Sequence, residues 1–389
     1  MKTIFKNARI IGSKGELFQN SLSVENGIIT SFDCDGGADE IIDCNGKYIV
    51  AGFIDVHVHG GGGYDITDCT PESAAAVVNV HLSHGTTSIY PTTVSCSRER
   101  LASVFENFRK SKAMGLFRSN VNGLHLEGPF LSPLMCGAQR PDLIIPPTDE
   151  DISLYKANSD IIKRITVAPE VPRVDRLIAE LSPSGVKFSM GHTNATFEEA
   201  DNAYRAGADS ITHLYSATSG FHKINQKVHI GVTQYAYAQK SVYAELIGDG
   251  HHVPKELLRL VVSLKGTNRV CIVTDAMRAA GTDVTESYLG EIDPKNRVII
   301  DDGVAKLPDK SSFAGSIGTM DNAFGFAVKA AGLSLSEASE ICSLTPAKLM
   351  GIADKKGSVD IGKDADLLIL NDELAVEKVF VGGKPILNN

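Results

Sequence analysis

Several features of membrane, secreted and nucleic-acid-binding proteins are missing from this 389-residue sequence. No apolar run approaches the ~18 residues of a transmembrane helix. The first residues, MKTIFKNARIIG, lack the apolar core and the cleavage site of a signal peptide. No block of lysines or arginines occurs, and the formal net charge is −9. We therefore expect neither a membrane partner nor a nucleic-acid partner.

CxxC spacing is also missing. The seven cysteines are scattered along the chain, and an odd, unpatterned set is typical of reduced thiols in a cytosolic protein. A hydrophobic content of 43% and a charged content of 22% are ordinary for a soluble globular enzyme. These features predict a cytoplasmic protein.

Both ends of the chain have the composition of β-strands and turns. Near the start, TIFKNARII, SLSVENGIITSF and EIIDCNGKYIVAGFID place β-branched and aromatic residues between Gly, Asn and Asp. The last forty residues have the same texture. We therefore predict a small β-sandwich domain built from residues 1–51 and 350–389.

The middle of the chain, residues 52–349, alternates β-like runs with helical stretches. Examples of the β-like runs are TTSIYPTTV, ITVAPE and VCIVTDA. Examples of the helical stretches are TPESAAAVVNVHLSHG and TFEEADNAYRAG. Repetition of this pattern over about 300 residues predicts a TIM-like (β/α)₈ barrel of the α/β class.

Chemically reactive side chains follow these β-like runs where each run ends. In a (β/α)₈ barrel, such positions point into the active site. The first two histidines are two residues apart, so they share one face of their strand. The residues in question are His57, His59, Glu127, His192, His213, His252 and Asp275.

Four of these imidazoles together with Glu127 suit a first-row metal such as Zn²⁺ or Fe²⁺. Asp275 follows a late strand outside that set. There it can accept a proton from a water molecule that the metal acidifies.

Each of these residues also has a structural alternative. A histidine at a strand end is most often a hydrogen-bonded structural residue, Glu127 could be a buried ion-pair partner, and Asp275 could be a helix N-cap. Their recurrence at successive strand ends favours the metal site. His81 and His84, in a helical stretch and its exit turn, and His125, two residues before Glu127, are weaker ligand candidates.

Longer motifs resemble a known family. AGFIDVHVHG and GKDADLLIL are similar to the amidohydrolase signature, and HLEGPF, GHTNAT, THLYSAT, VTDAMRAAG and FAGSIGTMDNA resemble the N-acetylglucosamine-6-phosphate deacetylases. The resemblance runs nearly end to end. It implies a barrel with a split β domain that removes the acetyl group from N-acetylglucosamine 6-phosphate, giving glucosamine 6-phosphate and acetate.

The resemblance also implies individual roles. Asp275 would take a proton from the attacking water and pass it to the departing amine. Zn or Fe is the expected ion, with Mn, Co and Ni as alternatives. One or two ions would be bound by His57, His59, Glu127, His192 and His213. The substrate would be contacted by Ala138, Gln139, Ser216, Ala217, His252, Phe313, Ala314 and Gly315.

The sequence departs from the family pattern in one segment. Ser216 replaces a substrate-contacting asparagine, and the arginine that binds the 6-phosphate across a dimer interface is missing. An ungapped count places Ile224 there, within FHKINQKVH. Lys223 or Lys227 could serve instead, although a lysine lacks the bidentate fork of arginine; His222 and His229 are further candidates. The resemblance also implies a homodimer.

Two rival functions follow from this departure. The protein could be an amidohydrolase of another substrate, either a different N-acetyl hexosamine or a cyclic amide. The glutamate at position 127 weighs against cyclic amides, because those enzymes mostly use a carboxylated lysine. The protein could instead be an inactive homologue that binds a sugar or regulates a partner, although the intact Asp275 and metal ligands argue against this reading.

Overall fold

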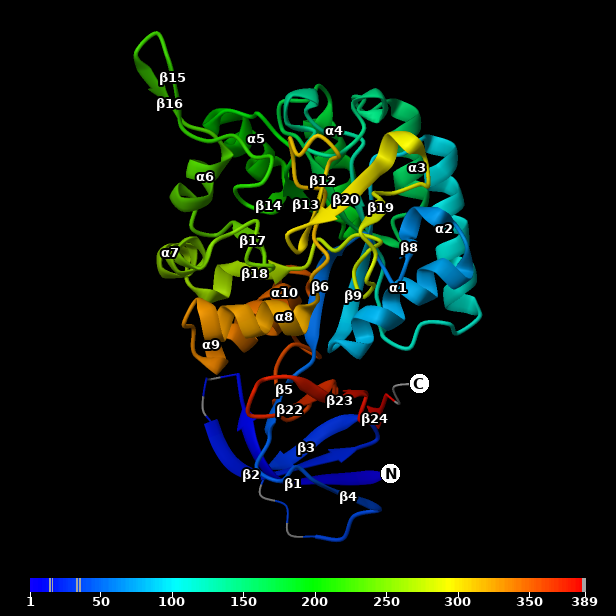
Figure 1. Ribbon diagram of the computed structural model, residues 1–389, viewed down its shortest axis with the longest axis vertical. Coiled ribbons are helices and arrows are strands. Elements are labelled where there is room, and N and C mark those ends of the chain that lie inside the picture. Colours follow the sequence, from blue (N-terminus) through cyan, green and yellow to red (C-terminus); the bar gives the residue numbers. More distant parts are fainter. Residues whose placement is uncertain (14, 16, 33, 35, 387–389) are drawn as a thin grey trace.

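The chain forms a barrel of parallel strands surrounded by helices, with a mixed sheet from both chain ends beneath it (Figure 1). The computed structural model describes residues 1–13, 15, 17–32, 34 and 36–386. The predicted fold class is confirmed. The predicted domain boundaries, after residues 51 and 349, stay predictions.

Eight parallel strands make the barrel wall and are joined in their order along the chain. They are β6 (Phe53–Val58), β9 (Thr86–Thr93), β11 (Leu124–Glu127), β12 (Ile162–Val167), β13 (Lys187–Met190), β14 (Ala208–Ile211), β17 (Tyr243–Ile247) and β18 (Val270–Val273). Past β18, the N–H of Asp275 donates to the carbonyl of His57 (2.9 Å). The N–H of His59 donates to the carbonyl of Ala276 (2.8 Å). These bonds nearly close the barrel at its carboxyl end.

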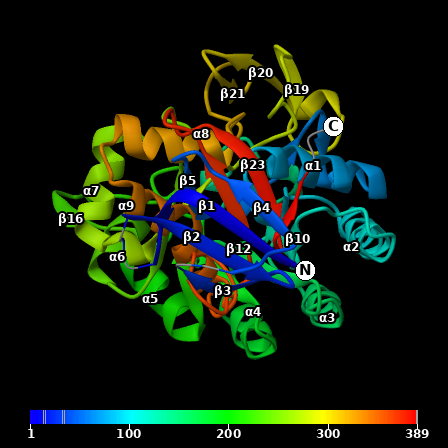
Figure 2. The same ribbon diagram turned by 90° about the horizontal axis from the view of Figure 1, so that it is seen from below.

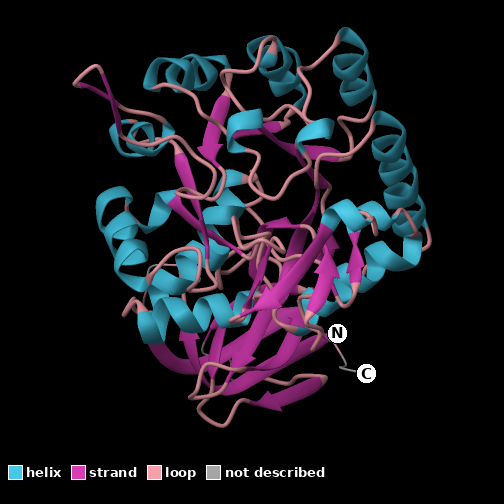
Figure 3. Cartoon of the chain, turned by 45° about the horizontal axis from the view of Figure 1, so that its top comes forward, coloured by secondary structure: helices cyan, strands magenta, loops and turns pink. Residues whose placement is uncertain are grey.

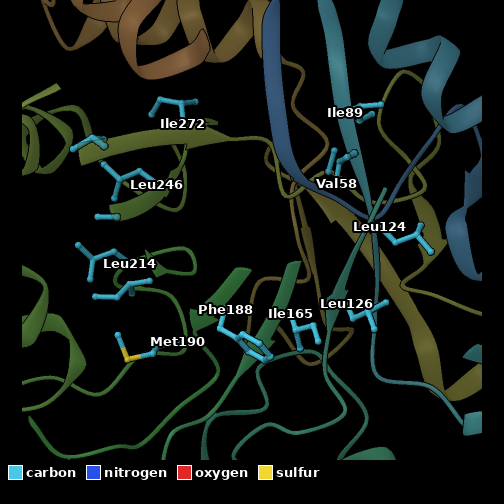
Figure 4. Packing of buried hydrophobic residues seen from close by; sticks show 14 of the residues in the cluster. Val58, Ile89, Leu124, Leu126, Ile165, Phe188, Met190, Leu214, Leu246 and Ile272 are labelled. Atoms are coloured by element: carbon cyan, nitrogen blue, oxygen red, sulfur yellow. The ribbon is translucent and has the colours of Figure 1, made fainter. Parts of the chain in front are cut away.

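Successive strand residues face opposite sides of the barrel wall. In β11, Leu124 and Leu126 belong to the main hydrophobic core, whereas His125 and Glu127 contact polar groups of the interior. The wall therefore packs against the helices on one side and carries polar chemistry on the other. Figure 4 shows further apolar residues of this core: Val58, Ile89, Ile165, Phe188, Met190, Leu214, Leu246 and Ile272.

Helices cover the outside of the barrel (Figure 3). They are α1 (Pro71–Ser83), α2 (Arg98–Ala113), α3 (Asp149–Ala157), α4 (Val174–Leu181), α5 (Phe197–Ala206), α6 (Val232–Ala238), α7 (Lys255–Lys265), α8 (Met320–Gly325), α9 (Leu335–Ser339) and α10 (Thr345–Leu349). Thr70, Ser97, Thr148 and Thr196 cap the starts of α1, α2, α3 and α5 by accepting backbone N–H bonds. No helix in the described ranges has the length and apolar content needed to cross a membrane.

Strands from both chain ends meet in one mixed sheet, which covers the lower end of the barrel (Figure 2). They are β1 (Lys2–Ile11), β2 (Leu17–Glu25), β3 (Ile28–Phe32), β4 (Glu40–Asp43), β5 (Tyr48–Ala51), β22 (Leu367–Leu370), β23 (Val376–Val381) and β24 (Lys384–Pro385). β5 pairs with both β1 and β22, so the N-terminal and C-terminal segments lie side by side. The mixed sheet has its own hydrophobic core, which includes Phe5, Ile49, Leu367 and Phe380.

Short strands extend the loops of the barrel. One strand, β10 (Asn120–Val121), adds to β9. The others form β7 (Gly60–Gly61) with β8 (Tyr64–Asp65), β15 (His222–Ile224) with β16 (Lys227–His229), and β19 (Glu286–Tyr288) with β20 (Arg297–Asp301) and β21 (Val304–Lys306). The β15–β16 hairpin projects away from the barrel (Figure 1).

The junction between sheet and barrel generates a stability prediction. Gly52 is the single residue between β5 and β6, and an added Cβ would lie 2.7 Å from the Cβ of Thr87. We expect Gly52→Ala to lower the free energy of unfolding by about 1–3 kcal/mol, the usual cost of overpacking. Gly37→Ala is the matched control, because nothing lies within 4 Å of its added Cβ. The free energy of unfolding of both variants should be measured by denaturant titration. Equal values for the two variants would contradict the prediction.

Candidate metal centre

Most of the predicted site residues line one cavity of about 270 Å³ at the carboxyl end of the barrel. This volume is near the lower end of ligand pockets, ~300 Å³. His57 and Ala314 are fully buried and are not among the lining residues, although the Nε2 of His57 lies 3.3 Å from that of His59. The predicted residues that line the cavity are His59, Glu127, Ala138, Gln139, His192, His213, Ser216, Ala217, His252, Asp275, Phe313 and Gly315.

Six side chains form two groups that could each hold a metal ion. Within each group, the candidate ligand atoms lie within 4.8 Å of one another, and all six residues are buried. The groups are His57, His59 and Asp275, and Glu127, His192 and His213. The structure thus places Asp275 beside the first pair of histidines, whereas the sequence pattern predicted it outside the ligand set.

Glu127 lies between the two groups. Its Oε1 is 3.1 Å from the Nε2 of His213 and 3.2 Å from that of His192. Its Oε1 is also 3.3 Å from the Nε2 of His57, and its Oε2 is 3.4 Å from that of His59. One carboxylate therefore contacts all four imidazoles, so Glu127 would be available to a metal ion held by either group.

All four imidazoles turn Nε2 toward the centre and Nδ1 toward an acceptor. An oxygen that can only accept requires the hydrogen to be on Nδ1, which leaves the lone pair of Nε2 free for a metal. The Nδ1 partners are the carbonyl of Thr92 for His59 (3.2 Å), that of Met135 for His192 (2.9 Å), that of Ser216 for His213 (2.9 Å), and the carboxylate of Glu245 for His57 (3.4 Å).

The electrostatics of the groups follow from burial and mutual contact. Burial by itself would raise the pKa of Glu127, but His192 and His57 hold it well below its ordinary range. Burial likewise opposes the lowering of the Asp275 pKa to about 2, which His57 and His59 cause. Burial would lower the pKa of His59, yet Asp275 and Glu127 raise it to about 9. A metal must therefore displace protons here, so its binding weakens as the pH falls.

Three members of the groups have an unusual backbone. The φ angles of His192, His213 and Asp275 are 45°, 29° and 48°. Left-handed φ values are uncommon outside glycine and cost about 1–3 kcal/mol each. Each of the three residues lies two positions past the end of its strand, β13, β14 or β18. The same turn at three strand ends thus directs a reactive side chain across the barrel mouth.

Two predicted substrate contacts have polar partners within the site. The Nε2 of Gln139 donates to the Oε2 of Glu127 (2.6 Å), and its Oε1 accepts from the N–H of Ser95 (2.7 Å). The Nδ1 of His252 donates to Asp249 (2.7 Å), which leaves its Nε2 for the cavity. Gln139 therefore supports a metal-site carboxylate as well as lining the cavity.

The predicted phosphate contact lies elsewhere. Lys223 is exposed on the β15–β16 hairpin and is not among the cavity-lining residues. Ile224 lies on β15, but its side chain is outside the described part of the structure. His222 and His229 face each other across the hairpin with ring centroids 5.5 Å apart. Among the described residues that line the cavity, none is a lysine or an arginine.

Several lining residues were not predicted from the sequence, namely Val94, Gly137, Tyr215, Ile247, Leu289 and Ser312. Tyr215 lies inside the motif THLYSAT, Ser312 directly precedes FAGSIGTMDNA, and Gly137 directly precedes the predicted Ala138, so all three adjoin predicted residues. Leu289 follows β19 and carries no local signal. His125 is a hydrogen-bonded core residue: its Nδ1 donates to the carbonyl of Val56 (3.1 Å) and its Nε2 accepts from Thr166 (2.8 Å).

The donor set fits divalent metal ions. Imidazole nitrogens and carboxylate oxygens are ligands for Zn, Fe and Mn alike. Two groups of three buried donors share one intervening carboxylate, and the Nδ1 partners orient every Nε2 inward. The two clusters are therefore consistent with one or two divalent ions.

Comparison with known proteins agrees with this geometry. Residues 48–386 match the amidohydrolase family model. The chain is 32% identical to human N-acetylglucosamine-6-phosphate deacetylase, covering 98% of this chain and 94% of the human protein. The crystal structure of the deacetylase from Pasteurella multocida has a TM-score of 0.92 at 29% identity, with full coverage of both chains. An aspartate-to-alanine mutant of the Mycobacterium smegmatis deacetylase, solved in complex with N-acetyl-D-glucosamine-6-phosphate, has a TM-score of 0.89 at 29% identity, again with full coverage of both chains. The chain is thus an amidohydrolase and belongs to the family of the N-acetylglucosamine-6-phosphate deacetylases.

Proposed function

We propose that this protein hydrolyses the acetamide of N-acetylglucosamine 6-phosphate to glucosamine 6-phosphate and acetate. The observation that carries the proposal is the Asp275 carboxylate, which lines the cavity and lies 3.1 Å from the Nε2 of His59 in one of the two metal-binding groups. The relatives that carry this activity in their names, and the sugar phosphate bound to the Mycobacterium smegmatis protein, support the choice of substrate.

Asp275 is the proton carrier of the proposed reaction. Its lowered pKa, which its contacts with His57 and His59 cause against the effect of burial, keeps the carboxylate ionised at neutral pH. It takes a proton from the water that attacks the acetyl carbonyl and delivers it to the departing amine. A divalent ion held by Glu127 and the four imidazoles would supply Lewis-acid activation of this hydrolysis.

The rim of the cavity orients the sugar. His252, held by Asp249 through its Nδ1, presents its Nε2 as an acceptor for a hydroxyl group. Its ring packs against that of Phe313, with centroids 4.7 Å apart. Ser216, Ala217 and the backbone of Gly315 line the same cavity. These groups are fixed by neighbours before substrate arrives, which reduces the entropic cost of binding.

The absence of a lysine or arginine among the described lining residues favours a second candidate, an unphosphorylated N-acetyl hexosamine. A phosphate group normally takes a cationic partner. For the first candidate, Lys223 or Lys227 on the projecting hairpin would have to reach the cavity of a second subunit. We accordingly include a homodimer in the proposal and treat the cytoplasm as its compartment.

The first prediction concerns Asp275. We expect Asp275→Asn to lower kcat by ~10²–10⁴-fold, the usual contribution of a positioned proton carrier. Acetate release should be measured at saturating substrate, and bound metal quantified in the same samples. Near-normal turnover would place the proton carrier elsewhere.

Metal binding by the unmodified protein without turnover of any acetylated sugar or cyclic amide would favour an inactive homologue.

The second prediction separates metal ligands from other cavity histidines. We expect His192→Ala to lose bound metal, because it removes one of three donors from its group. His252→Ala is the matched control: it alters the same cavity and the same residue type, but it lies outside both groups. It should keep its metal and raise KM. Bound metal should be measured in both variants by elemental analysis. Equal metal contents would refute the assignment of His192 as a ligand.

The third prediction tests the phosphate group. We expect the protein to release acetate from N-acetylglucosamine 6-phosphate with a higher kcat/KM than from N-acetylglucosamine. The double variant Lys223→Ala/Lys227→Ala should lose that preference without losing activity on the unphosphorylated sugar. Equal kcat/KM values for the two sugars in the unmodified protein would exclude the phosphate requirement and favour the second candidate.

A further inference from the structure

One ligand histidine differs from the other three in what holds it. The Nδ1 atoms of His59, His192 and His213 face backbone carbonyls, whereas the Nδ1 of His57 faces the side chain of Glu245 at 3.4 Å. Backbone carbonyls are fixed by the strands and loops that carry them. A side-chain carboxylate can rotate, so its orientation needs a further contact.

Arg164 supplies that contact. Arg164 on β12 forms an ion pair with the Oε1 of Glu245 on β17, and both side chains are completely buried. The Nη2 of Arg164 also donates to the Oγ of Ser210 on β14 (3.2 Å). The ion pair therefore crosses the barrel interior between strands that are not neighbours in the wall. With Oε1 engaged by the guanidinium, Oε2 faces the Nδ1 of His57 (3.4 Å) and accepts from the backbone N–H of His213 (3.5 Å).

Core packing does not explain this pair. Burying two charges is costly, and apolar side chains of similar volume often stabilise a protein as well or better. The barrel interior nevertheless contains the Arg164 guanidinium and the Glu245 carboxylate, next to the metal-binding groups. A guanidinium can only donate hydrogen bonds and a carboxylate can only accept them. This order of donors and acceptors leaves a single arrangement for the neutral imidazole that a metal requires: hydrogen on Nδ1 and lone pair on Nε2.

We propose that Arg164 and Glu245 are positioning residues that fix the tautomer and ring orientation of His57, and so set the metal affinity of the group formed by His57, His59 and Asp275. This inference rests on the proposed metal-dependent function. The Nε2 of His57 is 3.5 Å from the Oδ1 of Asp275 and 3.3 Å from the Oε1 of Glu127. A ring turned to the other tautomer would place a hydrogen at the point where the metal binds.

The test is a double variant that removes both charges together. Arg164→Met/Glu245→Leu leaves no unpaired buried charge, and it deprives the Nδ1 of His57 of its acceptor. Metal-stripped protein is titrated with Zn²⁺ in competition with a chromophoric chelator. We expect the affinity for one ion to fall ~10–100-fold, the usual effect of removing an outer partner of a ligand histidine. Binding at the Glu127, His192 and His213 group should stay within a few-fold of the unmodified protein.

Two matched variants separate positioning from packing. Arg164→Met/Glu245→Gln restores an acceptor oxygen without a charge, and we expect it to recover most of the lost affinity. Ser210→Ala removes the other contact of Arg164 and should leave Zn²⁺ affinity unchanged. Unchanged affinity for both ions in Arg164→Met/Glu245→Leu would overturn the proposal. So would an equal loss for both ions with a lowered Tm, because that pattern indicates general loosening of the barrel.

A measurement on the unmodified protein covers the case in which the double variant does not fold. In the zinc-loaded protein labelled with ¹⁵N-histidine, the ring signal of His57, assigned by its loss in His57→Ala, should show hydrogen on Nδ1. Hydrogen on Nε2 would overturn the proposal. Failure of the unmodified protein to bind Zn²⁺ at all would instead reject the proposed function itself.

Discussion

A buried carboxylate that touches four imidazoles is the constraint on which this structure depends. Glu127 is 2% exposed, and its oxygens lie 3.1–3.4 Å from the Nε2 atoms of His57, His59, His192 and His213. A charge in such a place is tolerated only when it is fully compensated. Gln139 completes that compensation from the cavity side. The positions of both metal-binding groups follow from the need to surround this one side chain.

The barrel meets this need through its strand ends. Parallel strands bring their carboxyl ends to one mouth, and alternation within each strand keeps the apolar residues against the helices. His192, His213 and Asp275 then leave their strands through the same left-handed turn. Backbone strain of this kind persists only where the surrounding structure over-determines it. Here the flanking strands and the Nδ1 hydrogen bonds of the histidines provide that support, so the site is organised before any ligand binds.

The parts of the fold and of the site that could be predicted from the sequence are those marked by the alternation of strands and helices. The barrel, the split β domain and the convergence of His57, His59, Glu127, His192 and His213 all follow from residues placed at regular intervals relative to strands. Arg164 and Leu289 could not be found in this way. Arg164 lies mid-strand, where a charged residue usually indicates an exposed face, and its partner is eighty-one positions away on a strand that is not its neighbour. Leu289 lines the cavity from the end of β19, in a three-stranded sheet separate from the barrel wall, and local pattern does not encode that placement.

The residues proposed for catalysis are therefore buried in the barrel, whereas those proposed to select the substrate lie in loops. The atoms proposed to carry out hydrolysis are buried in the barrel, where strands fix them and where a change in one side chain disturbs several others. The residues that would choose among sugars lie in loops, and the segment that departs most from the family pattern is the β15–β16 hairpin, which projects into solvent. Phe221, directly before β15, and Val228 on β16 are 59% and 58% exposed. Loops tolerate replacement because few contacts depend on them. The buried metal-binding groups can thus stay intact while the hairpin changes, so the reaction and the choice of sugar are set by separate parts of the chain.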